Sequence, residues 1–304
     1  MAVAHVGPGV AVYVASLNTA HATELCIRTM REYAAYPFRL TVGDSGSTDG
    51  TLEMLGDFQE RGWLDHESQP GWHHWQWLEH WRHRGDEPYV VFVDSDVQFR
   101  RRGWLRRLVD GAAVSGSAFV AATIEREVPA FTHETLHQPI VRLARRPSAH
   151  LLLIDTTRMP PVENLFAGRT VEAPALPEGF IHYDVGGWLL EELERRRVPW
   201  SVMPWRYRFC YRHYGGLSWL PGMGGALARR KRRELQLAAC RLQRARARQD
   251  RLPDAHRRVA SSIVTEAALV ARGAAERTFG VLMLQDPAVV SRMRRLRSAG
   301  RRRL

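Results

Sequence analysis

Residues 89–96 read Tyr-Val-Val-Phe-Val-Asp-Ser-Asp, an apolar run that ends abruptly in two aspartates. The part from Tyr89 to Val93 predicts a buried strand, because β-branched and aromatic residues suit a strand covered on both faces. Two buried carboxylates this close together repel each other and are costly unless a cation compensates them. The stretch therefore predicts a sheet with a hard divalent ion at one strand end, although a capped turn is the alternative interpretation.

The flanking segments alternate between strand and helix patterns. Short apolar runs predict further strands, and stretches with helical spacing separate them. This alternation favours an α/β fold with a mainly parallel sheet covered by helices, in which ligands bind at the carboxyl ends of the strands. The expected strands span residues 10–15, 39–43, 89–93, 119–123, 151–154 and 180–183, and the expected helices span residues 25–33, 51–60 and 188–196.

A turn-rich run, Asp44-Ser45-Gly46-Ser47-Thr48-Asp49-Gly50, follows the strand over residues 39–43. One interpretation is a strand-to-helix turn capped by Ser47 or Asp49. The other is a nucleotide contact, since an aspartate at this strand end can accept the imide hydrogen of a pyrimidine base. The run has neither a Walker pattern nor a Rossmann glycine fingerprint.

Histidines and tryptophans crowd residues 72–83. A metal site built from His73, His74, His80 and His83 is one interpretation, but these side chains lack carboxylate or cysteine partners at the usual spacing. We therefore expect an amphipathic helix with its tryptophans on the core side.

The formal charge is +12, and nearly all of the positive side chains are arginine, since Lys231 is the only lysine. A genome rich in G and C produces this bias without any functional cause. The charge gathers in residues 229–248 and 292–304. This basic tail keeps a nucleic acid or an anionic membrane surface open as a partner.

Residues 220–304 predict a helical appendage. Helical patterns span residues 226–249, 254–272 and 286–297. Leu235 and Leu242 share one face of the first helix, and Val259, Ile263 and Val270 share one face of the second. We expect Leu235, Leu242 and Ile263 to be buried and most arginines to be solvated.

The three cysteines, Cys26, Cys210 and Cys240, show neither a disulfide framework nor zinc spacing. We recognise neither a signal peptide nor an apolar stretch long enough to span a bilayer. These features predict a cytoplasmic protein, with peripheral membrane association through the basic tail left open.

Taken together, the segments resemble the family 2 glycosyltransferases over residues 10–219. Their order and spacing carry the resemblance, and Gly71-Trp72-His73-His74 stands where many members have a glycine-rich stretch. The other matching segments are the opening strand Val12–Asn18, the turn Val42–Thr51, the metal motif Val93–Val97 with Gly103-Trp104-Leu105, the acceptor-side segment Tyr183–Leu189 and the late histidine segment His213–Trp219.

The resemblance implies a catalytic domain over residues 9–219 that moves a sugar, with inversion, from a nucleoside diphosphate donor, for which we expect UDP. It implies Mn²⁺ or Mg²⁺ as cofactor, because the developing charge on the leaving diphosphate needs a cation. The implied metal ligands are Asp94, Asp96 and His213, the implied donor contacts are Ser16, Asn18, Asp44, Ser47, Asp94 and Ser95, and the arginines expected to assist are Arg206, Arg208 and Arg212.

Inverting transfer needs a base on the acceptor side, opposite the leaving diphosphate. Our candidate is Asp184, where the neighbouring Gly186 and Gly187 let a substrate approach the backbone closely. The same position also suits a helix N-cap. Asp155, which follows the strand over residues 151–154, is the second candidate.

The acceptor is not indicated, and a small molecule, a lipid or a polysaccharide precursor is the leading expectation. The first alternative is the same chemistry on a nucleic acid or a protein. The second is a nucleotidyltransferase, although residues 10–20 lack the early glycine-rich loop of that class. The third is a non-catalytic nucleotide-sugar binding module, against which the presence of Asp94, Asp96 and His213 argues.

Overall fold

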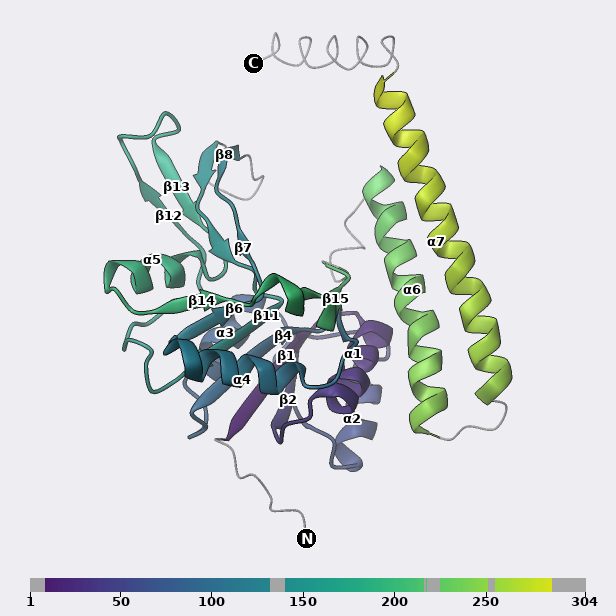
Figure 1. The fold of residues 1–304 in the computed structure, drawn as a ribbon. Helices are drawn as coiled ribbons and strands as arrows, with labels where there is room; N and C mark the ends of the chain where they lie inside the picture. Colours follow the sequence, from purple (N-terminus) through teal and green to yellow (C-terminus); the bar gives the residue numbers. More distant parts are fainter. Residues whose placement is uncertain (1–8, 132–139, 216, 218–224, 251–254, 286–304) are drawn as a thin grey trace. The chain divides into compact units, whose positions relative to one another are not determined.

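A seven-stranded sheet organises the first part of the chain (Figure 1). The computed structural model describes residues 9–131, 140–215, 217, 225–250 and 255–285, which divide into one unit up to Gly222 and a second from Met223. All neighbouring strands run parallel except around β11, which is antiparallel to both of its neighbours. The mainly parallel α/β fold is therefore confirmed. In sheet order the strands are β14 (Trp200–Val202), β6 (Phe119–Ala121), β11 (Leu151–Asp155), β4 (Tyr89–Asp94), β1 (Val10–Ser16), β2 (Arg39–Asp44) and β3 (Asp65–Ser68).

Helices cover both faces of this sheet. The central strand β1 is buried on both sides, with Val12 and Val14 in one core and Tyr13 in the other. The first core is covered by α1 (Ala20–Tyr33), α2 (Thr51–Glu60) and α4 (Trp104–Ser115), and the second by α3 (His74–Arg82) and α5 (Gly187–Arg195). Burial on both faces explains why these strands read as continuous apolar runs.

The helix α3 buries two of its three tryptophans, as the amphipathic interpretation predicts, whereas Trp75 is half-buried. Trp77 and Trp81 are fully buried and stack with ring centroids 4.8 Å apart. Both rings lie on β2 where it has no side chain, since a Cβ at Gly43 would come within 2.7 Å of Trp77 and 2.6 Å of Trp81. A glycine in β2 is thus what lets α3 dock.

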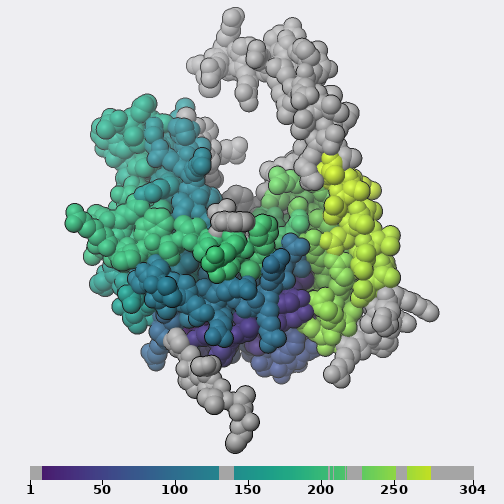
Figure 2. Space-filling model, in the orientation of Figure 1, coloured from purple at the N-terminus to yellow at the C-terminus, as the bar shows by residue number. Residues whose placement is uncertain are grey.

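Short strands outside the main sheet were not expected from the sequence, apart from β13. Most of them make a separate lobe that is teal at the upper left of Figure 2. Its four-stranded sheet has the order β12 (Arg169–Glu172), β13 (Phe180–Tyr183), β9 (Val141–Leu143) and β8 (Val128–Phe131), while β10 (Arg146–Pro147) pairs with β7 (Ile124–Glu125). A further pair joins β5 (Val97–Phe99) to β15 (Tyr211–His213), which follows the 3₁₀ helix η1 (Trp205–Cys210).

The second unit contains two helices in its described part, α6 (Gly225–Gln249) and α7 (Ala255–Gln285), which pack against each other. Leu242 is buried and Leu235 is half-buried. The prediction that the face of α7 with Ile263 is buried is wrong, because Ile263 is 53% exposed. Glu266 instead pairs with arginines of α6, so the packed face follows Glu266 rather than Ile263.

Three further expectations concern helices and cysteines. The third expected helix, residues 286–297, lies outside the described residues. Within the described residues, no helix is both long and apolar enough to cross a bilayer. Cys26, Cys210 and Cys240 are buried free thiols.

Candidate functional site

The carboxyl ends of β1, β2 and β4 meet at one edge of the main sheet. The register pairs Ser16 with Asp44 and Ala15 with Asp94. The antiparallel strand β11 begins at this same edge, where the Asp94 amide donates to the carbonyl of His150 over 3.1 Å. The site is therefore built from the last residues of the parallel strands β1, β2 and β4 and from the residues at the start of the antiparallel strand β11.

A strand pair brings His213 to the two aspartates. The strand β5 directly follows Asp96 and pairs antiparallel with β15, so that Val97 lies opposite His213. The His213 Nε2 atom is 3.1 Å from Asp96 Oδ1 and 3.4 Å from Asp94 Oδ2. Ligand atoms of the three side chains lie within 4.8 Å of one another.

The unsatisfied atoms of this cluster fit a divalent cation. Asp96 Oδ1 and His213 Nε2 are buried, and neither has a hydrogen-bond partner of good geometry among the described residues. Buried polar atoms of this kind are rare and costly. Two carboxylates and an imidazole whose ligand atoms lie this close together are a donor set suited to a divalent metal ion.

The charges in the cluster are strongly coupled. Burial alone would raise the pKa of Asp94, but His213 and His74 next to it hold the pKa well below its usual range. Burial would likewise lower the pKa of His213, yet the contacts with Asp94 and Asp96 raise it to about 10. Burial, followed by the charge of His213, lowers the pKa of His150 to about 4. The cluster therefore holds a proton on His213 and keeps the Asp94 carboxylate charged.

A cavity of about 510 Å³ opens over this cluster. Of the residues expected from the sequence, it brings together Ser16, Asp94, Ser95, Asp96, Asp184 and His213. The hydroxyl groups of Ser95 and Thr19 lie 3.0 Å apart and join the aspartate loop to the start of α1. One open space is therefore lined both by the cluster of Asp94, Asp96 and His213 and by the Asp184 carboxylate.

Asp184 lies in the loop between β13 and α5. Its side chain is 39% exposed and forms an ion pair with Arg146 of β10, which also pairs with Glu125 of β7 over 2.8 Å. The loop reaches β10 because Gly186 has φ +78° and leaves room for Pro147, 3.0 Å from where a Cβ would stand. Gly186, not Asp184, is the N-cap residue of α5. The capping interpretation therefore does not explain Asp184.

Asn18, Asp44 and Ser47 lie outside the lining of this cavity. The Asp44 carboxylate is fully buried and accepts from the amides of Gly46 and Ser47, at 2.9 and 2.7 Å, and from the Ser47 hydroxyl at 2.5 Å. Asn18 accepts from the Thr48 amide over 2.8 Å. These hydrogen bonds hold the loops after β1 and β2 together, as expected if the run over residues 44–50 is a strand-to-helix turn.

Two residues considered from the sequence lie elsewhere. Asp155 ends β11, which is antiparallel, and pairs in register with Tyr89 at the start of β4. It is therefore at the opposite edge of the sheet, where it accepts from Thr157 and Arg158. Arg206 lines a different pocket and is not among the residues that line this cavity.

The sequence reasoning missed several cavity residues. His74 Nε2 is 3.3 Å from Asp94 Oδ1, and the His150 ring stacks on His213 with centroids 4.3 Å apart. His150 also contacts Ser148 and, through Nε2 at 3.1 Å, the hydroxyl of Tyr211. His74 belongs to the run of histidines and tryptophans that we interpreted as an amphipathic helix. His150 precedes a strand whose antiparallel direction was not predicted.

Comparison with known proteins gives a consistent family. The family description "Glycosyl transferase family 2" matches residues 11–169, more than half of the chain. No curated protein sequence matches significantly.

Several solved structures are similar to this chain. A mannosyltransferase of Pyrobaculum calidifontis, in complex with GDP-Man and Mn²⁺, is 18% identical, with 93% of this chain and 84% of that chain covered and a TM-score of 0.39. Glucosyl-3-phosphoglycerate synthase of Mycobacterium tuberculosis, with Mn²⁺, UDP and glucosyl-3-phosphoglycerate, is 15% identical, with 82% of each chain covered and a TM-score of 0.40. TarS of S. aureus, residues 1–349, is 11% identical, with 80% and 73% covered and a TM-score of 0.37.

Proposed function

This chain belongs to glycosyl transferase family 2 and is a glycosyltransferase, and on that premise we propose that it transfers a sugar from a UDP-sugar to an acceptor hydroxyl with inversion. The observation that carries the proposal is the shared cavity. The cluster of Asp94, Asp96 and His213 lines it together with Asp184, so one space offers both a cation site and a carboxylate.

The donor side follows from the cluster. Asp94, Asp96 and His213 are the residues that would hold the cation, and the unsatisfied Asp96 Oδ1 and His213 Nε2 atoms are two of its ligands. A bound cation would neutralise the negative charge that develops on the leaving diphosphate. Ser16 and Ser95 line the same wall and offer hydroxyl groups to the donor. We propose that Asn18, Asp44 and Ser47 support this wall through the hydrogen bonds of their turn. A direct contact of Asp44 with the base of the nucleotide is our second proposal for this turn.

The acceptor side follows from Asp184. In an inverting transfer the acceptor oxygen forms a bond to the anomeric carbon while the bond from that carbon to the diphosphate oxygen breaks. The hydroxyl proton passes to a carboxylate, and Asp184 is our candidate. Arg146 fixes the orientation of this carboxylate through their ion pair. Trp72 and Trp75 line the cavity as well and give apolar surface on which a sugar ring can lie.

We assign the chemistry to residues 9–219 and propose that residues 220–304 form an appendage outside it. For the acceptor, a small molecule, a lipid or a polysaccharide precursor remains our proposal. A nucleic-acid acceptor bound by the basic tail would show binding that falls steeply as salt is added.

The experiment is a donor screen. The protein is incubated with Mn²⁺ and a panel of UDP-, dTDP- and GDP-sugars, and both thermal stabilisation and donor hydrolysis are measured. We expect UDP-sugars to stabilise and to be hydrolysed, and Asp96→Asn to lose both effects. Asp57→Asn is the matched control, because Asp57 is exposed on α2. Hydrolysis that is equal in both variants would reject the metal cluster, and a response to GDP- or dTDP-sugars alone would reject UDP.

A further inference from the structure

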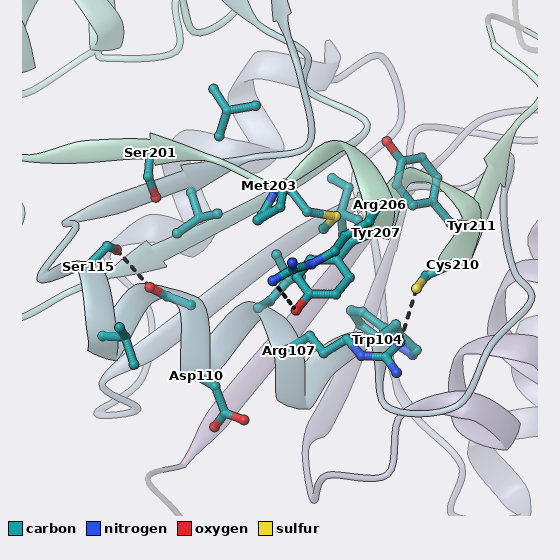
Figure 3. A pocket seen from close by; sticks show the side chains of 17 residues that line it. Trp104, Arg107, Asp110, Ser115, Ser201, Met203, Arg206, Tyr207, Cys210 and Tyr211 are labelled. Atoms are coloured by element: carbon teal, nitrogen blue, oxygen red, sulfur yellow. Dashed lines mark hydrogen bonds between the residues drawn. The ribbon is translucent and has the colours of Figure 1, made fainter.

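A second pocket, of about 400 Å³, lies between α4 and the segment from β14 to β15 (Figure 3). Its inner wall is apolar and is formed by Leu108, Val120, Leu151 and Met203. These residues belong to the core on the α1, α2 and α4 side of the sheet. At the rim, Val114 of α4 lines the pocket and is 90% exposed. The volume is within the range of small-molecule sites.

The walls of this pocket are held in place by contacts outside it. The Trp104 ring stacks on Phe99 with centroids 4.0 Å apart, and its Nε1 donates to the Met30 carbonyl over 3.2 Å. The Tyr211 hydroxyl contacts His150 Nε2 over 3.1 Å. Gly111 of α4 leaves open space, since a Cβ there would meet no atom within 4 Å. The cavity is therefore pre-formed, which lowers the cost of binding a ligand.

One end of the pocket is positively charged. The guanidinium groups of Arg107 and Arg206 both lie over the Tyr207 ring, at 5.5 and 5.1 Å from its centroid. Both arginines are exposed, and among the described residues neither forms an ion pair with a carboxylate. Asp110 also lines the pocket, but its carboxylate points away from the tyrosine (Figure 3). It forms an ion pair with Arg106.

We propose that this pocket binds a single-chain amphiphile with an anionic head, separately from the sugar-transfer cavity. The apolar wall takes the chain, because burial of apolar surface is its main driving force. Arg107 and Arg206 take the head, because guanidinium groups bind carboxylate and phosphate oxygens with paired hydrogen bonds. An uncharged or wholly apolar ligand would leave these two arginines without a charged partner, since their hydrogen bonds within the protein go to Cys210 and Tyr207. A small inorganic anion would leave the apolar wall empty.

The test is calorimetric titration of the full chain with octyl phosphate, octanoate, octanol and inorganic phosphate. We expect octyl phosphate and octanoate to bind with one ligand per chain. Octanol should bind at least about tenfold more weakly, since charge-assisted hydrogen bonds are worth about 1.5–3 kcal/mol. Inorganic phosphate should give no measurable binding. Equal affinity for octanol and octyl phosphate, or for inorganic and octyl phosphate, would overturn the proposal.

Three variants locate the binding. Gly111→Leu fills the pocket from a helical position with open space, and it should abolish binding of both anionic amphiphiles. Gly56→Leu is its matched control on α2, where a Cβ also meets no atom within 4 Å, and it should bind normally. The double variant Arg107→Gln, Arg206→Gln should lose about tenfold in affinity for octyl phosphate and none for octanol. Unchanged octyl phosphate affinity in a folded Gly111→Leu protein, with folding checked by thermal melting, would place the ligand elsewhere.

Discussion

Binding of a divalent cation should expel one proton from the metal cluster. In the metal-free protein, proximity to Asp94 and Asp96 raises the pKa of His213 to about 10, so that at neutral pH the imidazole carries a proton. A cation needs the neutral imidazole and takes over the neutralising role of that proton. The same proton stabilises the metal-free fold fully below about pH 6.5, the ordinary histidine pKa, and this stabilisation is lost as the pH rises through 10.

The expected magnitude follows from the number of protons released. With one proton exchanged per ion, the apparent affinity for Mn²⁺ should rise about tenfold for each pH unit, and thus about a hundredfold from pH 6 to pH 8. This slope holds wherever the pH stays below the pKa of His213. At pH 7 the affinity should be about a thousandfold below its limit at high pH.

The assay is calorimetric titration with Mn²⁺ at pH 7 in buffers that differ in ionisation enthalpy, which counts the protons released. We expect one proton per ion for the native chain. The variant His213→Gln should bind more weakly and release almost none. A native chain that releases no proton, with an affinity that does not change with pH, would refute the reasoning, because His213 would then be neutral or outside the coordination sphere.

Four other outcomes are expected. Asp184→Asn should cut sugar transfer about a hundredfold or more while UDP and Mn²⁺ binding stay nearly intact, and unchanged turnover with chemistry rate-limiting would assign it a structural role. The free energy of unfolding should fall by about 3 kcal/mol from pH 6.5 to 4, because the unfolded chain protonates His150 before the folded one does; His150→Gln should flatten this part of the profile measured by urea unfolding. Gly43→Ala should destabilise by about 1–3 kcal/mol in urea through its clash with two indole rings, whereas Gly56→Ala, with open space in a helix, should not destabilise. Deletion of residues 286–304 should leave donor hydrolysis intact, and loss of UDP binding would show that the tail helps to build the active site.

The strands of the main sheet could be predicted because burial on both faces leaves a direct mark in the sequence. The run from Tyr89 to Val93 is such a case, and β4 begins at Tyr89 and extends only one residue further, to Asp94. The direction of β11 leaves no such mark, because a buried strand reads the same whichever way it runs. Because the direction of β11 was not predicted, Asp155 was expected at the wrong edge of the sheet, and His150 was not recognised as a residue of the site.

The candidate site was predictable where the chemistry is local in the sequence. Asp94 and Asp96 could be recognised because they directly follow an apolar strand, whereas His213 was expected only from a family resemblance. The roles of His74 and Arg146 could not be predicted, since they come from contacts with Asp94 and Asp184 that only folding creates. In α7, periodicity alone allowed more than one buried face, and the ion pairs of Glu266 with α6 decided which face is packed.

The pairing of β5 with β15 has a consequence for synthesis of the chain. The ribosome makes the two aspartates early, whereas His213 lies near the end of the first unit's sequence. A growing chain can fold its early strands as they emerge, but its acidic loop has no imidazole to meet until β15 is complete. A polypeptide released before β15 would therefore have the two carboxylates without the histidine, and on the proposed function it could not hydrolyse sugar nucleotides.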